Sequence, residues 1–420
     1  MLPSLTHFED KHHVPWPTWP ISTARTEEYL LTALRSGRWA VSGAYTGTQS
    51  FEELFARRFG EFIGTGYAVP TCNGSAALTI AMEALGVGVG DEVLVPGLTW
   101  VACASAVLRV GAVPVCVDVE PDTLCMSVDA ASEAITPRTR LVMAVHLYGS
   151  AVDLDQMINL TARWGIPLLE DCSHVHGATW RSRRLGSFGH IGAFSLQQTK
   201  LLTSGEGGVT TTSDTELYDQ LFRKRVDGRR RRRSTPLGEL ELDELAGVQG
   251  YNYCMSEFNA AVALDGLDRL DTENMTRRVA MRRLDDLLTK IDGAQPLARP
   301  AALTSDAAYQ YCIRLDPAVF KANSKHAVAA SLSRSLGIPI EPIDSALNRN
   351  VLYQPLASGW AAASEHGARR LDPTRFRLPI AERAGENCVL LPHRLFLAPP
   401  ERMELVADAL REARDQLARA

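Results

Sequence analysis

The chain of 420 residues has no long hydrophobic run. It contains no stretch of about eighteen consecutive apolar residues, the length that suggests a membrane-spanning helix. Residues 1–13 contain three charged side chains and lack the apolar segment of a signal peptide. From these absences we expect a protein that is neither inserted into a membrane nor exported, with a cytoplasmic location.

Closely spaced cysteines and a strong net charge are also missing. The eight cysteines include no CxxC pair and mostly have apolar neighbours, which favours reduced core thiols over disulfides or a zinc site. The formal charge is -5, so the chain as a whole has no general attraction for DNA or anionic lipid. With 45% hydrophobic and 22% charged residues, the composition is that of a globular enzyme and excludes intrinsic disorder.

Short apolar runs alternate with helical patterns, which is typical of an α/β fold with a mostly parallel sheet. The predicted strands are residues 92–95, 113–117, 140–145 and 166–169. Ser213 and Glu216 predict a capping box at the start of a helix, and a long helical pattern covers residues 256–291. We predict a large domain over residues 1–265 and a smaller C-terminal α+β domain over residues 266–420.

Two motifs could bind a ligand at strand or helix ends. Residues 72–78, with the sequence CNGSAAL, form a small-residue turn before a helix, which is either a phosphate site or an ordinary helix cap. An apolar strand ends at Asp171, where the carboxyl edge of a sheet places ligands. Asp171 could pair with a ring nitrogen, or bind a metal with His174 and His176, or the histidines could be structural. No further ligand follows at a recognisable spacing, so we predict no metal.

A third motif is a lysine in an apolar setting. Lys200 is the single charged residue between positions 191 and 205, and a glycine-rich turn follows it. Desolvation would lower the pKa of such a lysine, as a nucleophilic amine requires, although a lone lysine commonly reaches solvent instead. A phosphate site, an acid at a strand end and a shielded lysine are together the parts that hold pyridoxal phosphate (PLP).

The sequence resembles the DegT/StrS group of PLP-dependent sugar aminotransferases over residues 39–392. The matching segments are TCNGSAAL at 71–78, GDEV at 90–93, EDCSH at 170–174, SLQQTK at 195–200, GEGG at 205–208 and YNYCMSE at 251–257. The resemblance implies a fold-type I transferase, like aspartate aminotransferase, with a large PLP-binding domain.

The resemblance also implies roles for single residues. Lys200 would carry PLP, Asp171 would pair with its pyridine nitrogen, and both would be catalytic. The remaining cofactor-binding residues are His174 at the ring oxygen, Trp100 stacked on the ring, and Gly74, Ser75 and Ser195 at the phosphate. Asn252 would reach the phosphate of the neighbouring subunit, which implies a homodimer with shared active sites.

Segments 196–200, 252–257 and 391–394 are similar to the inosose aminotransferases of aminoglycoside antibiotic biosynthesis. This similarity implies a ping-pong transfer of an amino group from L-glutamine to scyllo-inosose or its 2-deoxy form. One alternative is an aminotransferase for a nucleotide-linked keto-sugar, and another is elimination or aromatisation chemistry on the same cofactor. Lys200 argues against the dehydratase relatives, which have histidine at that position.

A different class of function is suggested by a basic segment. Residues 223–225 and 229–233 place eight basic side chains within eleven positions, which could bind nucleic acid. Aromatic residues are not interleaved with them, and acidic residues follow closely, so a solvated loop is the ordinary interpretation. Five polar residues near strand ends or loops are either substrate contacts or structural: His146, Tyr148, Tyr353, Gln354 and His393.

Overall fold

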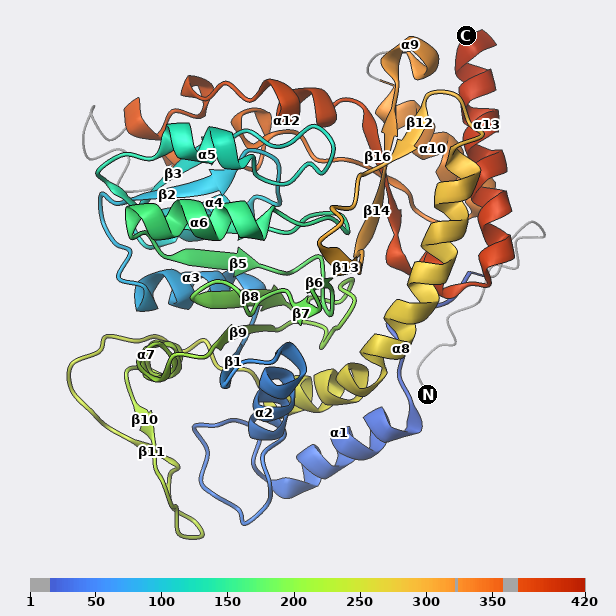
Figure 1. The fold of residues 1–420 in the computed structure, drawn as a ribbon. Coiled ribbons are helices and arrows are strands. Elements are labelled where there is room, and N and C mark those ends of the chain that lie inside the picture. The colour runs from blue at the N-terminus through green and yellow to red at the C-terminus, as the bar shows by residue number, and fades with distance from the viewer. Residues whose placement is uncertain (1–15, 322–323, 358–368, 420) are drawn as a thin grey trace.

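A seven-stranded sheet forms the centre of the larger part of the molecule (Figure 1). The computed structural model describes residues 16–321, 324–357 and 369–419. The strands, in spatial order, are β1 Tyr67–Thr71, β9 Gly208–Thr212, β8 Ile191–Ser195, β5 Leu168–Asp171, β4 Thr139–Val145, β2 Glu92–Pro96 and β3 Val113–Val117. β9 is antiparallel to both of its neighbours and the other pairs are parallel. The four predicted strands are confirmed, although β5 starts two residues later than predicted and reaches Asp171.

Helices cover both faces of this sheet, which explains why every residue of β2 and β3 is buried. The helices are α2 Phe51–Ile63, α3 Gly74–Ala84, α4 Ala102–Arg109, α5 Val128–Ala134, α6 Leu154–Trp164 and α7 Thr215–Arg225. α5 and α6 lie on the near face in Figure 1. α3 packs against α4 and α7.

The predicted capping box before α7 is wrong by one residue. The N-cap is Asp214, whose carboxylate accepts hydrogen bonds from the backbone N–H groups of Glu216 and Leu217. Ser213 directly follows the last residue of β9, so the side chain one position later is the one placed over the first helical turn.

A second, smaller sheet has its own core. Its antiparallel strands, in spatial order, are β12 Ala294–Pro296, β14 Gln310–Leu315, β16 Cys388–Pro392 and β15 Glu341–Pro342. The helices of this part are α9 Pro317–Phe320, α10 Lys325–Leu336 and α13 Met403–Arg419, whereas α12 Pro379–Ala384 packs into the core of the large sheet. Three short pairs complete the described strands: β6 Thr179–Trp180 with β7 Arg183–Arg184, β13 Leu303–Ser305 with β6, and β10 Arg230–Arg231 with β11 Leu242–Asp243.

Helix α8, Glu257–Leu288, confirms the long helical pattern and links the two parts (Figure 1). Its first half, with Ala263 and Leu267, packs into the core of the large sheet beside α2 and the N-terminal helix α1 Ala24–Ser36. Its second half, with Met281 and Leu284, packs into the second core beside α13. The predicted boundary between the two domains, after residue 265, falls inside this continuous helix, so the boundary remains a prediction.

The structure also shows the state of the cysteines and the apolar character of the described helices. All eight cysteines are free thiols, and six of them are buried. Among the described helices, none combines the length and the apolar character needed to cross a bilayer.

Candidate active site

A cavity of about 480 Å³ lies at the carboxyl ends of the parallel strands, where the large sheet meets the small one. Strand ends at this edge are where open α/β sheets bind ligands. Seven of the eight predicted site residues line this cavity: Gly74, Ser75, Trp100, Asp171, His174, Ser195 and Lys200. Asn252 does not line it; this residue is exposed on the loop before α8. The large sheet thus brings together residues that are up to 126 positions apart in the chain, from Gly74 to Lys200.

The turn before α3 is a helix cap, and its geometry also fits an anion site. The Asn73 side chain accepts a hydrogen bond from the backbone N–H of Ala76 at 2.8 Å, which is the cap. The N–H groups of Gly74 and Ser75 belong to the first helical turn, which has no intrahelical acceptors for them. A Cβ on Gly74 would lie 2.7 Å from the Cβ of Ser195, so only glycine allows the end of β8 to approach so closely. The hydroxyl groups of Ser75 and Ser195 therefore line the same cavity as the free N–H groups of the first turn of α3, an arrangement that fits a phosphate.

Asp171 is held in a fixed orientation at the end of β5. Its Oδ1 accepts a hydrogen bond from the backbone N–H of Ser173 at 3.0 Å, and its Oδ2 accepts one from the Cys103 thiol at 3.3 Å. Burial, and then the charge of Asp171, raise the pKa of Cys103 well above its usual range, so this thiol stays a donor. Cys103 was not predicted, because nothing in the sequence distinguishes this thiol from the other apolar-flanked cysteines.

The neighbouring acid, Glu170, points to the other face of the sheet, as alternation along a strand requires. It accepts hydrogen bonds from three backbone N–H groups, of Gly186, Phe188 and Gly189. Burial alone would raise its pKa, but the pKa is lowered by these donors and by His146, whose Nε2 lies 3.2 Å from Glu170 Oε2. Glu170 and His146 are therefore structural, and neither lines the cavity.

Lys200 is desolvated as the sequence predicted. Burial lowers its pKa to about 8, and the negative charge of Asp171 only partly opposes this effect. Its Nζ lies 3.8 Å from the centre of the Tyr309 ring. The loop before it is fixed from two sides: His393 Nε2 donates to the Thr199 carbonyl at 3.0 Å and Trp19 Nε1 donates to the Gln198 carbonyl at 3.0 Å. His393 thus has a structural role in positioning the lysine.

The two histidines after Asp171 have different surroundings. Burial first, and then the charges of Lys200 and His176, hold the pKa of His174 well below its usual range, so its ring is neutral. Its Nδ1 is buried without a hydrogen-bond partner among the described residues, which leaves an atom free for a bound group. Burial lowers the pKa of His176 to about 3, and its Nε2 donates to the Ser195 carbonyl at 2.9 Å.

The metal alternative for Asp171, His174 and His176 finds no support in the described part of the chain. There, the ligand atoms that lie close enough together to bind one ion belong to His146, Glu170 and Cys172. Both ring nitrogens of His146 are already used, since Nδ1 accepts a hydrogen bond from the N–H of Val152.

Three polar residues that the sequence left as either substrate contacts or structural residues differ in their position relative to the cavity. Tyr148 lines the cavity, whereas Tyr353 and Gln354 do not. The second sheet and the residues next to its strands add cavity-lining side chains that the sequence did not predict, which are Tyr309, Gln310, Glu341 and Asp344. They follow no motif, and only the packing of the two parts places them beside Lys200.

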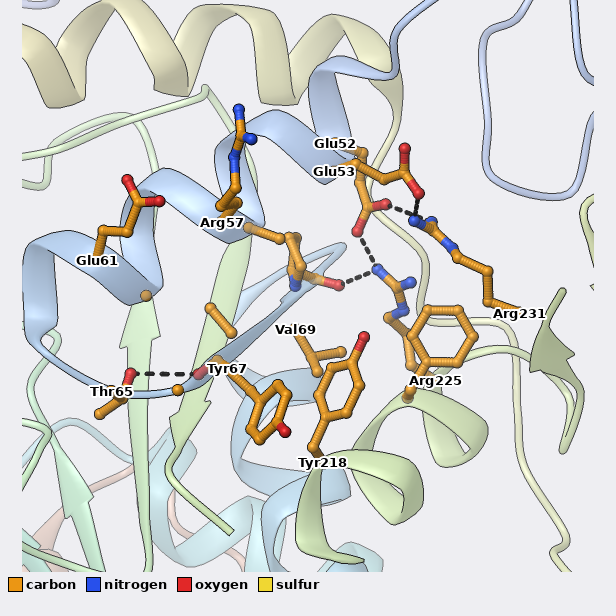
Figure 2. A pocket seen from close by; sticks show the side chains of 16 residues that line it. Glu52, Glu53, Arg57, Glu61, Thr65, Tyr67, Val69, Tyr218, Arg225 and Arg231 are labelled. Carbon is orange, nitrogen blue, oxygen red and sulfur yellow. Dashed lines mark hydrogen bonds and ion pairs between the residues drawn. The ribbon is translucent and has the colours of Figure 1, made fainter. Parts of the chain in front are cut away.

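Most side chains of the basic segment form ion pairs with acidic residues of the same chain. Arg229 pairs with Asp227 at 2.8 Å, Arg230 with Asp219 at 3.2 Å and Arg232 with Glu239 at 2.8 Å. Arg231 and Arg225 point toward Glu52 and Glu53 at the edge of a second cavity of about 370 Å³ between α2, β1 and α7 (Figure 2). These pairings leave little free positive charge for nucleic acid, and no predicted site residue lines this second cavity.

The profile of the DegT/DnrJ/EryC1/StrS aminotransferase family matches residues 20–411. The chain belongs to this family. It is 42% identical over 403 residues to the L-glutamine:scyllo-inosose aminotransferase of Streptomyces griseus, covering 96% of this chain and 95% of that protein. It is 43% identical over 399 residues to the L-glutamine:2-deoxy-scyllo-inosose aminotransferase of Micromonospora echinospora, covering 94% and 93%.

Among solved structures, this chain is similar to the crystal structure of 3-amino-5-hydroxybenzoic acid synthase. The TM-score is 0.83 with 31% sequence identity, and the match covers 97% of this chain and 99% of that one. The fold prediction is thereby confirmed, and the protein is a PLP-dependent aminotransferase. The phosphate-binding turn, the oriented Asp171, the free Nδ1 of His174 and the desolvated Lys200 fit this cofactor.

Proposed function

We propose that this aminotransferase moves the amino group of L-glutamine to a cyclitol ketone, scyllo-inosose or 2-deoxy-scyllo-inosose, in aminoglycoside biosynthesis. The observation that carries the proposal is the identity of 42% with inosose aminotransferases over nearly the whole chain. The charge of the cavity supports it. Apart from Lys200, the charged lining residues are acidic: Asp171, Glu206, Glu341 and Asp344.

This acidic lining disfavours the alternative of a nucleotide-linked keto-sugar. A nucleotide diphosphate needs cationic side chains at its phosphates, and no arginine lines the described cavity of one chain. A cyclitol is neutral and rich in hydroxyl groups, which carboxylates and amides bind well.

Each residue has a defined task in the proposed reaction. When bound, the cofactor supplies an electron-accepting ring that stabilises the negative charge left on the substrate carbon. Lys200, with a pKa of about 8, is poised to accept a proton from that carbon and to return it at a neighbouring position. The Asp171 carboxylate stabilises positive charge at the ring nitrogen, and its two hydrogen bonds fix it before the reaction starts. The same cavity serves both half-reactions, so the kinetics are ping-pong.

The homodimer predicted from the sequence is part of this proposal. Asn252 is exposed and does not line the cavity of its own chain, which supports a role in the cavity of another subunit. Large apolar side chains are exposed near the same loop and the cavity mouth: Leu240, Leu245, Tyr251 and Trp100. An interface between two copies would cover these side chains and complete the phosphate site. We place the enzyme in the cytoplasm, where reduced cysteines are stable.

Absorption spectroscopy tests the cofactor and the donor. The purified wild type should show a visible band of bound PLP that L-glutamine bleaches, and Lys200→Ala should not turn over. Amino-cyclitol formation from each inosose, compared with a nucleotide-linked keto-sugar, then tests the acceptor. Turnover of the nucleotide sugar but neither inosose would overturn the proposal.

A further inference from the structure

Tyr148 lies at the cavity in a strained turn after β4. Its φ is 52°, a left-handed value that is unfavourable for a tyrosine, and the next residue, Gly149, has φ 82°. A Cβ on Gly149 would lie 2.6 Å from the Cβ of Ala308, so the turn is packed tightly against the second part of the molecule. Backbone strain of this kind is typical of functional sites.

The Tyr148 side chain is only 5% exposed, yet it lines the cavity. Its hydroxyl forms no hydrogen bond with a described side chain or backbone group, and it is not among the fully enclosed polar atoms that lack a partner. The hydroxyl is therefore open to the cavity, where it can form a hydrogen bond with a ligand group.

Two carboxylates from the second sheet line the same cavity. Glu341 lies on the edge strand β15, and Asp344 follows two residues after that strand. Within the described residues neither carboxylate forms an ion pair, and the nearby Lys325 ammonium donates instead to the backbone carbonyls of Ile343 and Gly385. Burial, and then the charge of Glu341, raise the pKa of Asp344.

The phenol and the two carboxylates line the same cavity, so one ligand can contact all three. Burial, and then the charge of Asp344, raise the pKa of Tyr148 well above its usual range. A phenol donates and accepts hydrogen bonds, whereas a carboxylate only accepts. Together they match hydroxyl groups, and the two negative charges repel a phosphate.

We propose that Tyr148, Glu341 and Asp344 form the acceptor subsite, which binds the ring hydroxyls of a neutral polyol and excludes phosphorylated sugars. This inference rests on the proposed transfer to a cyclitol ketone. It assigns three residues to recognition of the acceptor, so changes at these residues should affect the acceptor half-reaction more than the donor half-reaction.

The test separates the two half-reactions in the PLP-loaded enzyme. The variants are Tyr148→Phe, Glu341→Gln and Asp344→Asn, with Glu401→Gln as an exposed control outside the cavity. We expect the rate of bleaching by L-glutamine to stay within about twofold of wild type, while the KM for scyllo-inosose rises about tenfold, as for a lost hydrogen bond to a charged group. Equal effects on both half-reactions, or an unchanged KM for the acceptor, would overturn the subsite.

A binding experiment keeps this result distinct from a failure of the proposed function. Calorimetry with scyllo-inositol, an unreactive polyol, should show binding to wild type and about tenfold weaker binding to Asp344→Asn. An enzyme that turns over neither inosose but binds scyllo-inositol in this variant-dependent way would refute the proposed reaction and retain the subsite. Wild-type binding of an inositol phosphate as tight as that of scyllo-inositol would refute the exclusion of anions.

Discussion

Replacing Gly74 by alanine tests the close approach of α3 and β8 that forms the phosphate site. The new Cβ would lie 2.7 Å from Ser195 Cβ and 3.1 Å from Ser195 Oγ, so one of the two elements must move. Overpacking of this kind costs about 1–3 kcal/mol. Alanine regains up to about 1 kcal/mol over glycine in a helix interior and less at the first helical position, where Gly74 lies, so a net loss of about 1–2 kcal/mol is expected.

The loss divides between folding and cofactor binding. If the apoenzyme keeps its geometry, the free energy of unfolding falls by about 1–2 kcal/mol. If Ser195 moves instead, the phosphate site widens and the dissociation constant of PLP rises about five- to thirtyfold, at about 1.4 kcal/mol per factor of ten. Titration of the apoenzyme with PLP and denaturant unfolding of the same sample measure both quantities.

Gly88→Ala is the matched control, because a Cβ there would meet no atom within 4 Å and the residue has no positive φ. This control should be neutral or slightly stabilising, since alanine restricts the unfolded chain. Gly74→Ala with unchanged stability and unchanged PLP affinity would refute the steric argument.

Three further predictions concern the amine of Lys200, the thiol of Cys103 and the buried ion pair of Arg225. The rate at which the apoenzyme captures PLP should rise with pH through about 8, because only the neutral Lys200 amine is nucleophilic; a midpoint near that of free lysine would contradict the burial argument. Cys103→Val removes the donor to Asp171 and should weaken PLP binding about tenfold while Cys103→Ser restores it, measured by titration; equal affinities would show that the thiol does not orient the acid. Arg225→Ala leaves the buried Glu52 with the longer contact to Arg231, at 3.4 Å, and should cost about 3 kcal/mol of unfolding free energy, against less than about 1 kcal/mol for the exposed Arg230→Ala.

The sequence predicts well the part of the active site that the large sheet and its turns contribute, because this part consists of local motifs. The turn at residues 72–78 enters α3 as expected, and the predicted strands put Asp171 at a carboxyl edge. The uncharged neighbours of Lys200 in the sequence predict its desolvation, and Tyr309 from a distant segment completes its surroundings.

Contacts between distant segments are not visible in the sequence. The acid Asp344 reaches the cavity only because β15 pairs with β16 at the edge of the second sheet. The Cys103 thiol meets Asp171 through the packing of α4 beside the sheet, although 68 positions separate them. The basic run at residues 229–233 suggested a binding surface, but its ion-pair partners include Glu52 on the distant helix α2.

The continuous helix α8 has a consequence for how substrate preference can evolve. With 32 residues and a rise of about 1.5 Å per residue, its axis is about 48 Å long; the helix bends between its two halves and is anchored in both cores (Figure 1). A mutation that changes the angle between the two halves shifts the whole second part of the molecule against the catalytic lysine, which disturbs every acceptor at once. Exchange of the two-residue edge strand β15 and the loop after it leaves α8 in place. Specificity for a new acceptor can therefore evolve most readily by changes in β15 and the loop after it, while Asp171 and Lys200 keep their positions and their chemistry.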